Sequence, residues 1–63
     1  MKKKTVELKP GDVVLFGDLR DVVTGIELPK PPCVVVKVYV ERRGRAEFFY
    51  AGIESEQIVE DVK

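Results

Sequence analysis

The sequence predicts a small all-β protein of about five antiparallel strands, closed into a small barrel, with one short helical turn before the last strand. Three observations predict this class. Apolar side chains recur at every second position over much of the chain, glycines and prolines interrupt the apolar runs at short intervals, and no segment has the length and 3.6-residue period of a helix. The length of 63 residues fits one domain, residues 1–63.

The clearest strand signal covers residues 34–41, where four valines occupy alternate positions and therefore point to one side (Val34, Val36, Val38 and Val40). A second run of strand-forming residues, 45–51, follows after Arg42-Arg43-Gly44. Two such runs around a short glycine-containing loop predict a β-hairpin.

The register of this hairpin follows if Arg42-Arg43-Gly44 forms a three-residue loop in which Gly44 takes the left-handed conformation. Glu41 then faces Arg45, and the next residues along the two strands pair in turn. The predicted core face carries Val34, Val36, Val38, Val40, Ala46, Phe48 and Tyr50. The predicted outer face carries Lys37, Tyr39, Glu41, Arg45, Glu47 and Phe49.

The remaining segments predict shorter elements. Residues 9–12 form a turn, residues 13–16 and 22–28 form strands separated by Gly17-Asp18, and the proline-rich segment 29–32 is a connector. Residues 53–57 suit one helical turn, and residues 58–62 suit a last strand. Residues 1–4 are expected to be a flexible basic tail.

This layout resembles the SH3-like barrels. The segment Lys9-Pro10-Gly11-Asp12-Val13-Val14 is similar to the opening of many such barrels, including ribosomal and transcription-factor modules, and residues 32–62 are similar in layout to the small accessory barrel of photosystem I and to related electron-transport accessory barrels. The chain departs from peptide-binding SH3 domains, because it has no tryptophan for a polyproline groove. Residues 11–16 also resemble the ten-kilodalton co-chaperonins, but the mobile loop expected before that motif is missing. The resemblance implies a fold and hardly a function.

Composition sets further expectations. Eleven basic and eleven acidic side chains balance, although residues 1–45 carry a net charge of +4 and residues 46–63 a net charge of −4. The single cysteine, Cys33, cannot form an internal disulfide, and the basic start leads into Thr5-Val6-Glu7 without a hydrophobic segment, so we expect a cytoplasmic location and no membrane association. The absence of asparagine and the abundance of charged residues are typical of thermophile proteins.

Enzymatic activity is not expected. The chain has no histidine, the usual general base and metal ligand, and its one serine and one cysteine lie in no nucleophile motif. Cys33 begins a valine-rich strand, which favours a buried, inert thiol. The spacing of Asp12, Asp18 and Asp21 does not match an EF-hand calcium loop, and the three residues are interpreted as turn residues. We therefore expect no cofactor, no metal site and no small-molecule substrate.

Two binding hypotheses remain open. A protein partner or a second copy of the chain would use the exposed pair Tyr39 and Phe49 with Lys37 and the flanking arginines Arg42, Arg43 and Arg45, because aromatic and arginine side chains anchor many interfaces. Nucleic acid would use the same arginines on phosphates and the same rings for base stacking, although the neutral total charge disfavours it. The alternatives are a solvated turn for the arginines and, for Phe49, a satellite core under segment 29–32 or under the N-terminal segment. We expect protein binding, with nucleic-acid binding as the alternative.

Overall fold

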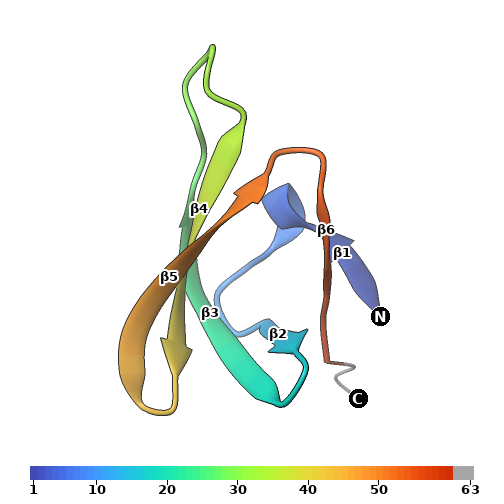
Figure 1. Ribbon diagram of the computed structural model, residues 1–63, viewed down its shortest axis with the longest axis vertical. Coiled ribbons are helices and arrows are strands. Elements are labelled where there is room, and N and C mark those ends of the chain that lie inside the picture. The colour runs from blue at the N-terminus through green and yellow to red at the C-terminus, as the bar shows by residue number, and fades with distance from the viewer. Residues whose placement is uncertain (61–63) are drawn as a thin grey trace.

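The computed structural model describes residues 1–60, and this part of the chain is all-β, with six antiparallel strands in two sheets (Figure 1). The strands and the one short helix are β1 (Lys2–Lys4), the 3-10 helix η1 (Thr5–Glu7), β2 (Val13–Phe16), β3 (Leu19–Glu27), β4 (Val35–Arg42), β5 (Arg45–Gly52) and β6 (Glu56–Ile58). The expected all-β class is therefore confirmed. The last two residues of the expected strand 58–62 lie outside the described residues.

The larger sheet is an up-and-down meander in the order β2-β3-β4-β5, so β2 and β5 lie at its two edges (Figure 1). Strands β2 and β3 are joined by the two-residue loop Gly17-Asp18, with Phe16 opposite Leu19. Gly17 has φ +56°, a left-handed conformation that glycine adopts without steric cost. The interruption predicted at Gly17-Asp18 is thus a tight hairpin turn.

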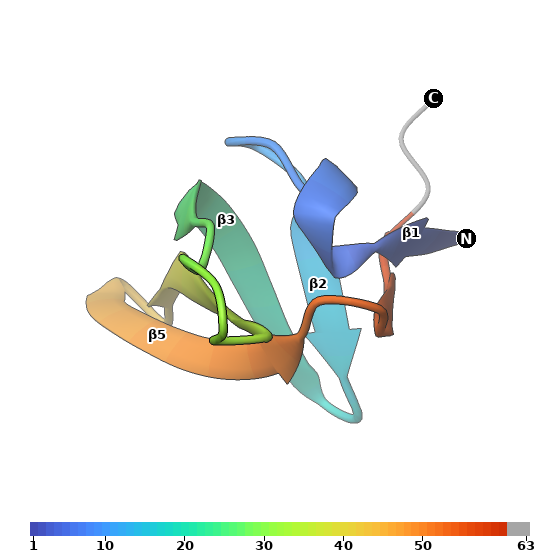
Figure 2. The same ribbon diagram turned by 90° about the horizontal axis from the view of Figure 1, so that it is seen from above.

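The smaller sheet joins the two ends of the described chain, because β1 pairs with β6. Residues 2–4, expected to be a flexible tail, form β1 instead. The ammonium group of Lys3 donates a hydrogen bond to Asp12 Oδ2, 3.0 Å away. An isolated bridge between Val14 and Val59 links this sheet to β2. Seen from above, the strands curve around the interior, but residues 1–60 form no closed barrel (Figure 2).

The helical turn is in a different place from the one expected. Residues 53–57 contain a non-helical turn followed by the start of β6, whereas η1 lies near the N-terminus. The Thr5 hydroxyl explains how η1 is held. Thr5 Oγ1 is within hydrogen-bonding distance of the Ser55 carbonyl at 3.1 Å and of the Ser55 hydroxyl at 2.8 Å, and it accepts a hydrogen bond from Gln57 Nε2 at 3.1 Å.

The core lies between the inner face of the meander and the two chain ends. Its buried members are almost all valines, because short β-branched side chains pack well on a pleated surface (Leu8, Val14, Val23, Val36, Val38, Val40 and Val59). Val36, Val38 and Val40 are buried as predicted, whereas Val34 is exposed. Partly buried Val6, Ile26, Phe49 and Ile53 complete the core.

The hairpin of β4 and β5 forms as predicted, but its register differs by one residue. Arg43 and Gly44 both have positive φ, +53° and +78°, so they make a two-residue loop with Arg42 opposite Arg45. Positive φ at both positions defines the type I′ turn, whose twist matches that of antiparallel strands. Because side chains alternate between faces, the shift moves every side chain of β5 to the other face.

The predicted core positions on β5 were therefore wrong. Phe48 and Tyr50 are exposed, and Phe49 is the partly buried ring that packs on the core. Phe49 lies directly opposite Val38 and makes an edge-to-face contact with Phe16, with ring centroids 5.2 Å apart. Placing one aromatic ring between β2 and β5 closes the apolar interior, which explains why this register is preferred. Glu47 remains exposed on the inner side of β5, near the hairpin tip.

Candidate binding face on the outer side of β4 and β5

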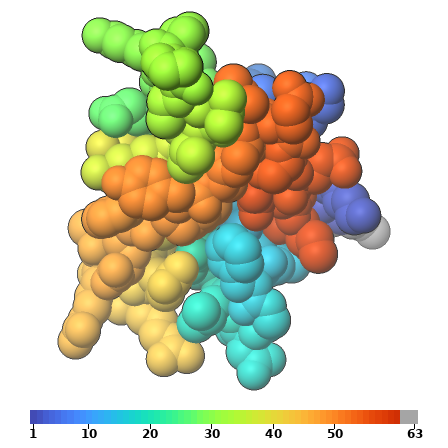
Figure 3. Space-filling model, turned by 45° about the horizontal axis from the view of Figure 1, so that its top comes forward, coloured from blue at the N-terminus to red at the C-terminus, as the bar shows by residue number. Residues whose placement is uncertain are grey.

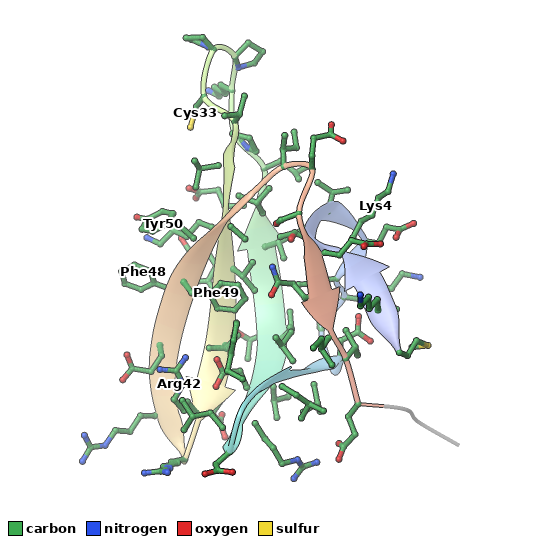
Figure 4. All side chains as sticks on the ribbon, turned by 45° about the vertical axis from the view of Figure 1, so that its right-hand side comes forward. Lys4, Cys33, Arg42, Phe48, Phe49 and Tyr50 are labelled. Atoms are coloured by element: carbon green, nitrogen blue, oxygen red, sulfur yellow. The ribbon has the colours of Figure 1, made fainter. Side chains whose placement is uncertain are left out.

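The shift in register gathers three aromatic rings on the solvent side of the sheet. Tyr39 of β4 lies directly opposite Phe48 of β5, and Lys37 lies directly opposite Tyr50. The fractions exposed are 36% for Tyr39, 52% for Phe48 and 61% for Tyr50. Phe48 and Tyr50 point away from the body of the protein, whereas Phe49 points inward from the same strand (Figure 4). We call Lys37, Tyr39, Phe48 and Tyr50 the aromatic face.

Lys37 is the centre of the aromatic face. Its ammonium nitrogen lies 4.3 Å from the ring centroid of Phe48, 5.0 Å from that of Tyr39 and 6.0 Å from that of Tyr50. These distances are typical of cation–π contacts. Phe48 and Tyr50 also contact each other edge to face, with centroids 5.6 Å apart. The four side chains therefore hold one another in place, and within residues 1–60 Lys37 has no ion-pair partner.

A groove of about 640 Å³ continues the aromatic face toward the loop that joins β3 to β4. This loop projects from the top of the molecule, beyond the end of β5, in the space-filling view (Figure 3). The groove is lined by Glu27, Leu28, Pro29, Lys30, Cys33, Val35, Lys37 and Tyr50. Leu28 and Val35 are exposed, so apolar side chains continue from the aromatic face toward the proline-rich loop, beside the charged groups of Glu27 and Lys30.

Arg42, expected at the partner-binding surface, is paired with a buried carboxylate of the neighbouring strand. Its Nε and Nη2 donate hydrogen bonds to the two carboxylate oxygens of Asp21, which is fully buried. The side-chain hydrogen bond to Asp21 raises the pKa of Arg42 above its usual value. Arg42 is therefore a structural residue, whereas Arg43 and Arg45 are exposed at the hairpin tip.

The expected pairing of Tyr39 with Phe49 on one face is wrong for the same reason as the register. Phe49 lies on the inner face, in contact with Phe16, so it forms a satellite of the core beside β2 and not under segment 29–32. Lys37 and Tyr39 do lie together as expected, but their aromatic neighbours are Phe48 and Tyr50. A two-residue turn at Arg43-Gly44, in place of the three-residue loop Arg42-Arg43-Gly44, would have predicted Phe48 and Tyr50 on the outer face.

Cys33 also differs from expectation. Its thiol is exposed in the loop between β3 and β4 and lines the groove, instead of being buried at the start of a strand (Figure 4). Strand β4 begins only at Val35, and this places Cys33 outside the sheet. Within residues 1–60, the thiol has one weak contact, 3.9 Å from the Val35 carbonyl oxygen.

Residues 1–60 contain no group of three or more histidine, cysteine, aspartate or glutamate side chains placed to hold a metal ion. Every buried side-chain nitrogen and oxygen atom in this range has a hydrogen-bond partner. No helix within it is both long and apolar enough to cross a membrane.

Comparison with known proteins found no matching family model, no matching curated protein and no matching solved structure.

Proposed function

We propose that the protein is a non-catalytic binding module that recognises another protein through the aromatic face. The observation that supports this proposal is the cluster of three exposed rings around Lys37, which leaves a large apolar area open on a small domain. Tyrosine and phenylalanine side chains are enriched where proteins bind one another, and tyrosine is among the residues that most often anchor such contacts. Exposure of these rings to water is unfavourable, so burying them under a partner would contribute favourable hydrophobic free energy to binding.

The charges on the outer side of the sheet favour a protein over nucleic acid. Glu27 on β3 pairs in register with Lys37, and Glu41 on β4 lies on the same side. With Lys37 and with Lys30 of the adjoining groove, these two carboxylates give the surface a mixed character, whereas a phosphate-binding surface needs a basic excess. The engagement of Arg42 by Asp21 removes one of the three arginines on which nucleic-acid binding would rest.

The SH3-like barrel and the cytoplasmic location belong to the same proposal. The support for the fold is the order of the strands, a four-stranded meander whose first strand is bridged to the chain end through Val14 and Val59. The support for a reducing compartment is the single exposed thiol of Cys33.

The proposal is tested by affinity capture from the source cells with the native protein and with the double variant Phe48→Ser, Tyr50→Ser. Proteins that bind the aromatic face are retained by the native protein and lost with the double variant. Ile58→Ser is the matched control, since Ile58 is an exposed apolar residue on β6 and lies outside the aromatic face. One arm includes nuclease, which removes proteins held through nucleic acid.

As a control, circular dichroism and urea unfolding are used to check that the double variant is folded. A set of captured proteins that is the same for the double variant and the native chain would contradict the proposal. Capture that disappears with nuclease would support the nucleic-acid alternative instead.

A further inference from the structure

The open edge of β5 lies beside the aromatic face. Within residues 1–60, β5 pairs with β4 alone, and no strand covers its other side (Figure 1). A two-residue hairpin loop makes Arg42 and Arg45 a pair that exchanges both backbone hydrogen bonds, and such pairs then alternate along the ladder. The bond from Ile53 N–H to the Val34 carbonyl, 2.8 Å long, continues this alternation.

It follows that the odd-numbered residues of β5 point their backbone groups toward β4. Ala46, Phe48 and Tyr50 point their N–H and carbonyl groups outward, to the open edge. Phe48 and Tyr50 therefore present two features at once, namely an aromatic side chain on the outer face and a free backbone pair at the edge. An extended segment that adds to this edge would place every second side chain against these rings.

The other face of β5 carries two exposed charges, those of Arg45 and Glu47. Within the described chain neither forms a close ion pair, although the charge of Glu47 helps to raise the pKa of Arg42. Arg45 lies opposite Arg42, a like charge whose guanidinium is already bonded to Asp21. An acidic side chain opposite Arg45 and a basic one opposite Glu47 would each form an attractive cross-strand pair on an added strand.

We propose that β5 binds an extended segment of another protein as an added antiparallel strand. This inference rests on the proposed function and names the partner's chemistry. From its N-terminus, the segment has apolar side chains opposite Tyr50 and Phe48, a basic side chain opposite Glu47 and an acidic side chain opposite Arg45. Read along the segment, the pattern is apolar, any, apolar, basic, any, acidic. Backbone hydrogen bonds to Ala46, Phe48 and Tyr50 provide the attachment, and the side-chain pairs provide the selectivity.

The test uses two capped synthetic peptides of the same composition, TITIKTE and TITIETK, which differ only in the order of their charges. Binding is measured by fluorescence anisotropy of labelled peptide, and the contact site by amide chemical shifts of Ala46, Phe48 and Tyr50. We expect TITIKTE to bind about five- to tenfold more tightly than TITIETK, because two attractive cross-strand pairs become repulsive in the second peptide. The double variant Arg45→Glu, Glu47→Lys should reverse this preference.

A second variant separates strand addition from binding to the rings alone. Ala46→Pro removes an N–H group that points to the open edge, so the ladder with β4 stays intact. It should weaken TITIKTE binding about fivefold or more. Ala46→Thr is its control, because threonine keeps the N–H group and suits a strand.

Unchanged binding to Ala46→Pro, or equal binding of the two peptides, would overturn strand addition while leaving the aromatic face as a binding surface. Absence of binding at millimolar peptide would also overturn it. Loss of capture by the Phe48→Ser, Tyr50→Ser variant tests the proposed function separately.

Discussion

The guanidinium of Arg42 donates two hydrogen bonds to the fully buried carboxylate of Asp21, 2.7 Å from Nε to Oδ1 and 2.6 Å from Nη2 to Oδ2. Asp21 of β3 and Arg42 of β4 are cross-strand partners, so the pair holds the two strands together near the hairpin tip. Arg42→Ala leaves a buried charge without its partner, which is strongly destabilising. We expect the melting temperature to fall by roughly 5–10 °C.

The matched control is Arg43→Ala, which removes the adjacent arginine from the solvent-exposed loop. Thermal unfolding followed by circular dichroism compares the two variants at neutral pH. Equal melting temperatures for both would show that the Asp21 carboxylate does not depend on Arg42.

The observed hairpin register makes opposite predictions for two adjacent phenylalanines. Phe49→Ala removes the ring that contacts Phe16 and the valine core, so it should lower the free energy of unfolding by about 2–3 kcal/mol. Phe48→Ala removes an exposed ring and should cost less than about 1 kcal/mol. Urea unfolding measures both, and a larger loss for Phe48→Ala would restore the register with Phe48 in the core.

The turn between β4 and β5 can be improved. Arg43 has φ +53°, a conformation that costs a residue with a side chain about 1 kcal/mol and that asparagine tolerates better. Arg43→Asn should therefore raise the free energy of unfolding by about 0.5–1 kcal/mol, and Gly44→Ala should lower it by about 1 kcal/mol. Chemical denaturation measures both changes, and stabilisation by Gly44→Ala would be incompatible with a type I′ turn.

The turn before β2 predicts a dependence of stability on pH. Burial of Asp12 acts to raise its pKa, but hydrogen bonds from the Lys9 N–H and the Lys3 ammonium group, together with the charges of both lysines, lower the pKa of Asp12 below its usual value. A lowered pKa means that the carboxylate stabilises the fold above the unfolded-state pKa, and that this contribution is lost as the pH falls through the folded-state pKa.

Asp12→Asn should therefore be less stable than the native protein at neutral pH, and the difference should shrink as the pH falls from about 5 to about 2. Urea unfolding at several pH values measures the difference. A difference that stays constant with pH would show that the ionised carboxylate contributes nothing.

Cys33 should react as an accessible thiol. Because it is exposed in the loop between β3 and β4, a thiol reagent such as Ellman's reagent should modify it completely in the native protein, without denaturant. The matched measurement is the rate in urea, which we expect to be within about tenfold of the native rate. Protection by several orders of magnitude in the native protein would indicate a buried thiol.

Much of the fold could be predicted because its signals are local. The alternating valines of β4, the glycine turn at Gly17-Asp18 and the proline-rich connector each indicate their structure through neighbouring residues alone. The pairing of β1 with β6 could not be predicted this way, since Lys2-Lys3-Lys4 has no strand propensity of its own. It is held by contacts with residues far along the chain, such as Gln57 opposite Lys3.

The candidate site depended on a single choice between two turns. Both a three-residue loop with Gly44 left-handed and a two-residue loop with Arg43 also left-handed fit the sequence, and the first places fewer side chains under strain. The contact of Phe49 with Phe16 favours the two-residue turn, because only that register places Phe49 on the inner face. The side chains of β4 lie on the same side of the sheet in either register, so Lys37 and Tyr39 could be predicted. The side chains of β5 change sides with the register, so Phe48 and Tyr50 could not.

The pairing of β1 with β6 also bears on the order of events during synthesis. The β2-β3-β4-β5 meander consists of consecutive hairpins and can form as the chain emerges, whereas Lys2–Lys4 must wait for Glu56–Ile58. Until then Val14 lacks its bridge to Val59, and one side of the interior stays open to solvent. A nascent chain halted after β5 should therefore be a substrate for chaperones and proteases, and synthesis of β6 allows it to reach the protected state.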